Sequence, residues 1–148
     1  MFEALLKALT GEDETPLPEP DARLALAALL VRLARTDGHY EASEIARIDV
    51  ILGRRYALSD ADAAKLRAEA ETLESEAPDT VRFTRAIKDH TAHEHRDSVI
   101  EDIWELALAD GSRSDDEDSL IRLVAPLLGI NDRDSALARQ RVIERLNG

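Results

Sequence analysis

Apolar side chains recur at every third or fourth position along most of this 148-residue chain, which is the spacing of amphipathic helices. Two segments are apolar on nearly every face. One runs from about Ala22 to Thr36 after an Asp21 cap, and the other from about Ala92 to Ala109 after Thr91 and Glu94, which form a capping-box pattern. Because a helix with little polar face must be buried, we expect these two helices side by side in the core.

The remaining pattern predicts five shorter helices and no strand. We expect them to start near Glu41, to run from Asp60 to Glu74 after a Ser59 cap and from Asp79 to about Asp89, to start near Ser114, and to run from Arg133 to Leu146 after Asn131-Asp132. The chain is therefore predicted to be all-α, a compact helical domain of about seven helices: three helices, a bridging helix and three more.

The first 20 residues differ in composition from the rest. A short mixed helix is followed by an acidic stretch, Thr10 to Pro20, that contains three prolines and a glycine and has the composition of a linker. We expect residues 1–20 to be an N-terminal helix and linker, and residues 21–148 to form a single domain, which suits a chain of this length.

An acidic turn occurs twice within the predicted domain. Each copy is an Asp-Gly pair with a glutamate seven residues after the aspartate: Asp37-Gly38 with Glu44, and Asp110-Gly111 with Glu117. The apolar residues keep the same register, since Leu26 matches Val99, Leu30 matches Ile103, Leu33 matches Leu106 and Ile48 matches Ile121. The repeat predicts two halves, about 21–76 and 91–147, related by an internal pseudo-two-fold.

Four carboxylates would meet if the two turns converge. Asp37, Glu44, Asp110 and Glu117 would then repel one another unless a cation neutralised them. A hard divalent ion with oxygen ligands, of the Ca²⁺ or Mg²⁺ class, is the most direct remedy. The repeat thus predicts a metal site made from these four residues.

A structural explanation of the same residues stays open. Each glycine can end a helix in the left-handed conformation, and each glutamate can stabilise the N-terminus of the next helix. An ordinary EF-hand is excluded, because Leu33 and Leu106 would stand at its first ligand position.

Composition narrows the classes of function. A formal net charge of −12 disfavours nucleic acid and anionic membranes as partners, and favours cations or a basic protein surface. The absence of cysteine excludes thiol redox chemistry and thiolate metal sites. No signal peptide or transmembrane segment is visible, so we expect a cytoplasmic protein.

Other groups of reactive residues do not match known catalytic or metal-binding motifs. His90, His93 and His95 lack the spacing of known helical metal motifs and are interpreted as an exposed cluster at a helix entry. The chain has no glycine-rich phosphate loop and no nucleophile elbow.

The duplicated turn resembles the tellurite-resistance TerB-like family. The segment from Trp104 to Gly111 and the run from Val124 to Ile130 are the most specific parts of the resemblance, which covers most of Asp21 to Leu146. It implies an all-helical fold with internal pseudo-symmetry and a metal site at the acidic positions named above. It also implies an association with tellurite and other chemical stress, without a known reaction.

Three functional hypotheses follow. The first is a non-enzymatic divalent-cation-binding protein of TerB-like type, linked to tellurite or a chemical stress response. The second is a metal-independent helical module that presents its acidic surface to a protein partner. A weaker third is a metal-dependent hydrolase, which would need an open coordination position beside a deep pocket.

Overall fold

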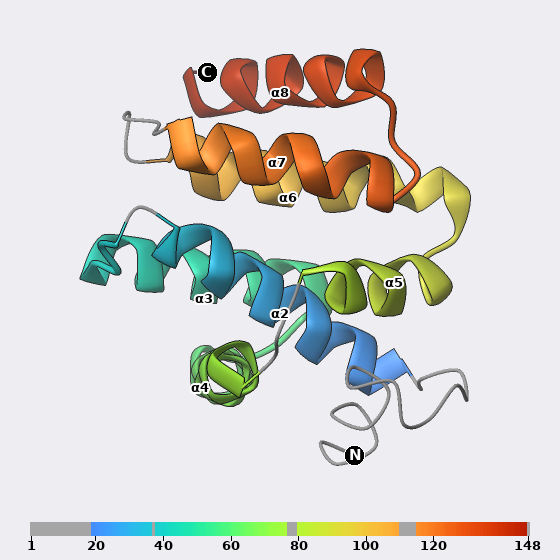
Figure 1. The fold of residues 1–148 in the computed structure, drawn as a ribbon. Helices are drawn as coiled ribbons and strands as arrows, with labels where there is room; N and C mark the ends of the chain where they lie inside the picture. The colour runs from blue at the N-terminus through green and yellow to red at the C-terminus, as the bar shows by residue number, and fades with distance from the viewer. Residues whose placement is uncertain (1–18, 37, 77–79, 110–114, 148) are drawn as a thin grey trace.

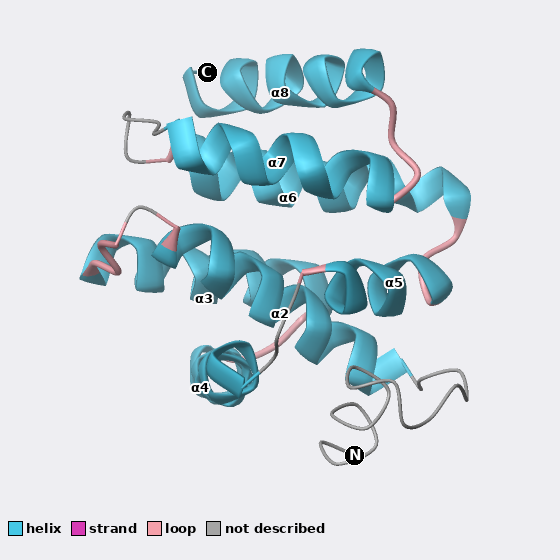
Figure 2. Cartoon of the chain, in the orientation of Figure 1, coloured by secondary structure: helices cyan, strands magenta, loops and turns pink. Residues whose placement is uncertain are grey.

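The computed structural model describes residues 19–36, 38–76, 80–109 and 115–147 of the chain. In that part the helices are α2 (Glu19–Arg35), α3 (Ala42–Tyr56), α4 (Asp60–Glu76), α5 (Val81–Asp89), the short 3₁₀ helix η1 (His93–His95), α6 (Arg96–Leu108), α7 (Asp115–Leu127) and α8 (Asp132–Asn147). Within the described residues there is no strand (Figure 2), so the predicted all-α fold is confirmed.

The helices are stacked in layers around α2 and α6. In Figure 1, α8 lies at the top, α6 and α7 lie beneath it, α2, α3 and α5 form the next level, and α4 crosses below. Helix α2 packs mainly on α4 and α5, whereas α6 packs mainly on α8. The indole Nε1 of Trp104 in α6 also donates a buried hydrogen bond to Ser135 Oγ in α8, at 3.1 Å.

The two apolar helices form the core, as their composition predicts. Helix α2 is buried almost without interruption between Leu24 and Ala34, and α6 is buried from Val99 to Ala107 except at the half-buried Glu101. Leu30, Leu33, Ile103 and Leu106, which match across the repeat, are all buried. Helix α2 contacts α6 directly, so the expected placement of the two helices beside each other is confirmed.

Two predicted helix starts are wrong. Helix α2 begins at Glu19 instead of after Asp21. Pro20 fits in its first turn, because the N–H that proline lacks would have no partner within the helix at that position. Thr91 and Glu94 do not start α6; residues His93–His95 form a 3₁₀ turn and α6 follows at Arg96. This tighter turn redirects the chain between α5 and α6.

The connections that follow α3 and α7 are built alike. Ala57 and Gly129 both have positive φ, of 54° and 82°, and the next residues, Leu58 and Ile130, each donate a backbone hydrogen bond to a carbonyl five residues back. The next helices are then capped in the same way, because Ser59 Oγ and Asn131 Oδ1 accept from the backbone N–H of Asp62 and Asp134. These paired features support the repeat locally, and the predicted pseudo-two-fold superposition stays a prediction.

Ala57 and Gly129 stand at equivalent positions but differ in side chain, and this difference provides a stability test. Ala57→Gly is expected to raise the free energy of unfolding by about 1 kcal/mol, since a left-handed alanine is strained and glycine is not. Gly129→Ala is expected to lower it by about 1 kcal/mol, because alanine is strained at the positive φ of this position; the added Cβ would lie 2.9 Å from Arg96 Nη1, a flexible side-chain end that can move aside. Urea unfolding of both variants measures this, and changes of the same sign would contradict it.

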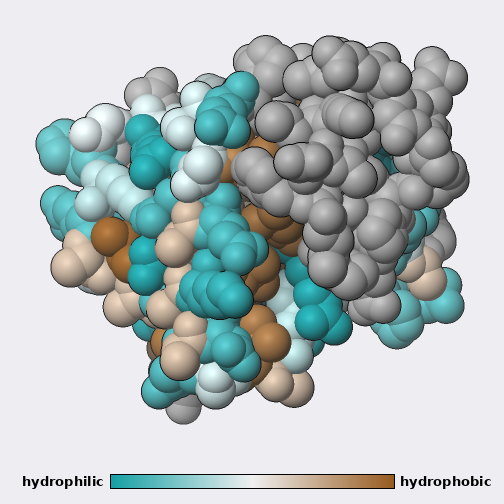
Figure 3. Space-filling model, turned by 90° about the horizontal axis from the view of Figure 1, so that it is seen from below, coloured by the Kyte–Doolittle hydropathy of each residue, from teal (hydrophilic) through white to brown (hydrophobic). Residues whose placement is uncertain are grey.

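Exposed apolar side chains are scattered over the described surface. No described helix is long and apolar enough to cross a bilayer. The large exposed apolar side chains are distributed over four helices: Val50, Val81, Leu123, Leu137 and Leu146. On the face seen from below, hydrophilic residues are interspersed with smaller brown apolar areas (Figure 3).

Candidate metal centre

The first acidic turn ends α2 with a glycine in the predicted left-handed conformation. Gly38 has φ 82°, and its N–H donates to the Arg35 carbonyl at 3.0 Å. The Thr36 hydroxyl donates to the Arg32 carbonyl at 2.7 Å. These bonds satisfy carbonyl groups that the helix end leaves open.

Tyr40 attaches this turn to α4. Its hydroxyl donates to Glu71 Oε2 at 2.7 Å, and the Arg35 guanidinium lies 4.9 Å from the centroid of its ring. Burial and the bond to the Glu71 carboxylate raise the pKa of the Tyr40 phenol well above its usual range. The phenol donates this bond at neutral pH and fixes the direction in which the chain enters α3.

Glu44 stands in the first turn of α3 and caps it. The backbone N–H of Glu41, the N-cap residue, donates to Glu44 Oε1 at 3.4 Å. The structural role considered for this glutamate is thus present in the fold.

The α2–α3 unit and the α6–α7 unit, which carry the two acidic turns, meet beside Glu44. Glu44 and Arg47 of α3 line the same small cavity, about 90 Å³, as Leu106 and Ala109 at the end of α6. Figure 1 shows the end of α2, the start of α3, the end of α6 and the start of α7 at the same side of the molecule. The residues next to the two acidic turns therefore come together, as a shared site requires.

Glu117 is buried in the first turn of α7, with 8% of its surface exposed. A carboxylate in such a position gains from the helix dipole but loses hydration. Asp37 and Asp110 lie outside the described residues. Among the described residues, which do not include those two aspartates, no group of three acidic or histidine side chains is arranged to hold a metal ion. The four-residue ligand set stays a prediction.

Two buried acids of α6 were not singled out by the sequence analysis. The Glu105 carboxylate, whose side chain is only 2% exposed, pairs with Arg54 at 3.0 Å, Arg145 at 3.1 Å and Arg47 at 3.5 Å. Asp102 pairs with Arg55 at 2.9 Å and with Arg54 at 3.0 Å. Burial raises the pKa of the Asp102 carboxyl, although Arg55 and Arg54 act in the opposite direction.

These pairs join α3 and α8 to α6, close to the cavity beside Glu44. The sequence could have indicated such pairs, because charged residues within an almost wholly apolar helix are seldom buried without partners. The sequence pattern alone does not name those partners, which come from helices distant in the chain.

The histidine cluster differs in part from its predicted exposed arrangement. His95 is exposed, but His90 is half-buried, and its Nε2 atom has no hydrogen-bond partner within the described residues. The His93 side chain lies outside what the structure describes.

Comparison with known proteins identifies a family. The family model described as tellurite resistance protein TerB matches residues 23–140, which run from α2 into α8. No curated protein and no solved structure shows a significant match.

Proposed function

The chain belongs to the tellurite resistance protein TerB family, and on that premise we propose that it is a non-enzymatic, cytoplasmic divalent-cation-binding protein linked to tellurite or a chemical stress response. The ion would bind at Asp37, Glu44, Asp110 and Glu117. It would connect the α2–α3 unit to the α6–α7 unit.

The observation that carries this proposal is the cavity shared by Glu44 and the end of α6. Asp110 directly follows Ala109, which lines that cavity, and Asp37 precedes Gly38 at the other turn. Carboxylate oxygens are the ligands that Ca²⁺ and Mg²⁺ prefer. A cation held between the units would offset the repulsion among the acids and favour the folded arrangement.

A metal-independent interaction module is the second candidate function. The specific observation in its favour is the hydrogen bond from Glu41 to Glu44, which gives that glutamate a role in helix capping. In this case the acidic turns would serve the fold, and the net charge of −12 would attract a basic protein partner.

Metal-dependent stability of the parent separates the two functions. At a concentration about 100 times its dissociation constant, a bound ion is expected to add roughly 2.7 kcal/mol to the free energy of unfolding. Melting curves in chelator and in excess Ca²⁺, Mg²⁺, Mn²⁺ or Zn²⁺ measure the increment. A parent whose melting is unchanged by all four ions would refute the metal site and leave the interaction module.

Asp110→Asn combined with Glu117→Gln tests the named ligands. In chelator this double variant is expected to be as stable as the parent or more so, because two repelling charges are gone, and it should lose the metal increment. The matched control, Glu69→Gln with Glu76→Gln, removes two exposed charges of α4 and should keep the increment. If the acids only cap helices, the first variant is instead less stable with and without metal.

A further inference from the structure

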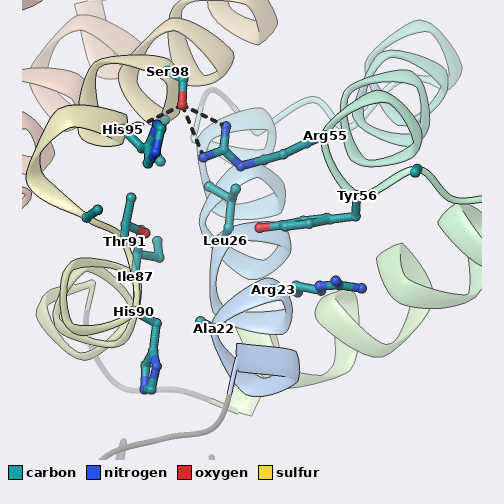
Figure 4. Close-up of a pocket in the computed structure, with 13 residues that line it drawn as sticks. Ala22, Arg23, Leu26, Arg55, Tyr56, Ile87, His90, Thr91, His95 and Ser98 are labelled. Atoms are coloured by element: carbon teal, nitrogen blue, oxygen red, sulfur yellow. Dashed lines mark hydrogen bonds between the residues drawn. The ribbon is translucent and has the colours of Figure 1, made fainter.

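A second cavity lies at the other end of α3, between the first half of α2 and the segment joining α5 to α6. Its volume is about 620 Å³. Figure 4 shows Ala22 and Leu26 of α2 along its floor, with Tyr56 at one side and Ile87 at the other. We name this cavity the α2 groove. Its volume and these side chains give it an apolar and aromatic surface of the size that a small ligand needs.

The charge of the α2 groove is opposite to that of the protein. Its lining contains Arg23, Arg55, His90 and His95, and no aspartate or glutamate is among the described residues that line it. The whole chain carries 31 acidic against 19 basic residues. These basic side chains make the groove a more favourable place for an anion than the acidic surface of the rest of the protein.

Hydrogen-bond donors stand at one end of the α2 groove in fixed positions. The Arg55 guanidinium is held by Asp102, at 2.9 Å, and both of its terminal nitrogens donate to Ser98 Oγ at 3.3 Å (Figure 4). The side chain of His95 lies beside this pair in Figure 4. Because Arg55 is already ordered, binding at this end loses little side-chain entropy.

The other end of the α2 groove carries Arg23 and His90. The Arg23 guanidinium lies 4.8 Å from the centroid of the Tyr56 ring, which restrains it. His90 Nε2 is buried and makes no hydrogen bond within the described chain. A buried polar atom of this kind gains free energy when a ligand supplies a partner.

We propose that the α2 groove binds a small phosphate-bearing metabolite, with the phosphate against the arginine and histidine side chains and the organic part over Ala22, Leu26 and Tyr56. Guanidinium groups match the geometry of phosphate oxygens, and a phosphate monoester carries close to two negative charges at neutral pH. The apolar floor distinguishes an organic phosphate from inorganic phosphate.

This groove is independent of the acidic turns. Arg55 lies eleven residues after Glu44 on α3, so the two positions are about 16 Å apart along the helix axis, at 1.5 Å per residue. The test of phosphate binding therefore stands or fails separately from the metal titration.

Titration of the full chain with phenyl phosphate and with inorganic phosphate tests the proposal, followed by NMR at constant ionic strength with sodium chloride as the reference salt. Phenyl phosphate is expected to give saturable shifts confined to residues lining the groove, with an affinity at least tenfold above that of inorganic phosphate. Equal affinities would remove the organic part of the proposal. Absence of saturable shifts with both compounds would overturn the site.

Variants then assign the binding residues. His95→Ala removes an exposed side chain, and Arg23→Gln with His90→Ala removes the groups at the other end; each variant is expected to weaken phenyl phosphate binding at least tenfold. Arg85→Gln, which removes an exposed charge of α5 outside the groove, is the control and should change affinity less than twofold. Melting curves verify that each variant is folded at the titration temperature, and His95→Ala remains decisive if the double variant is not. Equal weakening by Arg85→Gln would show general charge attraction and overturn the site.

Discussion

Leu33→Ala and Leu106→Ala are each expected to lower the free energy of unfolding by about 2 to 5 kcal/mol. Both leucines are buried, and each lies on a central helix, α2 or α6. Truncation removes three carbons, one methine and two methyl groups, from the core and leaves a cavity that packed neighbours fill only in part. Equilibrium unfolding in urea measures the loss, with an unchanged m-value showing that the native fold is retained.

Leu123→Ala is the control for these two variants. It makes the same chemical change on α7, where 51% of the leucine is exposed, and should cost less than about 0.5 kcal/mol. A cost below about 1 kcal/mol for both buried leucines would contradict the central place of α2 and α6 in the core.

Glu105→Gln is expected to cost about 3 kcal/mol, at the lower end of the range for breaking a buried ion pair. The carboxylate is almost fully buried and pairs with Arg47, Arg54 and Arg145 from two other helices. Glutamine keeps the shape but removes the charge that compensates these guanidinium groups. The lower end applies because the arginine side chains are 37–48% exposed, and water solvates them in part after the change.

Glu101→Gln provides the matched comparison. Glu101 lies one turn earlier on α6 and pairs with Arg141 and Arg145, but its side chain is 19% exposed. Surface pairs contribute little, so this variant should cost less than about 1 kcal/mol, and the cost should shrink further in high salt. Similar losses for Glu101→Gln and Glu105→Gln would show that burial of Glu105 adds nothing to its pairing.

Local chemistry explains why much of the fold was predictable from sequence. The apolar faces of α2 and α6, the caps at Ser59 and Asn131 and the left-handed Gly38 depend on residues within a turn or two of each other. Hydrophobic periodicity and side-chain capping act over that range. For the candidate metal site, the four residues that the repeat names stay a prediction, and the fold brings one of them, Glu44, next to the end of α6.

Features that depend on distant segments required the tertiary structure. One local feature was also misplaced by the capping pattern, because α6 starts at Arg96 after a 3₁₀ turn and not near Ala92. Glu105 can be buried because arginines from α3 and α8 reach it, and His90 lines a groove because α2, α3 and α5 enclose it. The sequence by itself determined which segments become helices and which faces they bury, since those choices follow from neighbouring residues. Tertiary structure alone decided which charges meet, because desolvation and ion pairing depend on contacts between residues far apart in the chain.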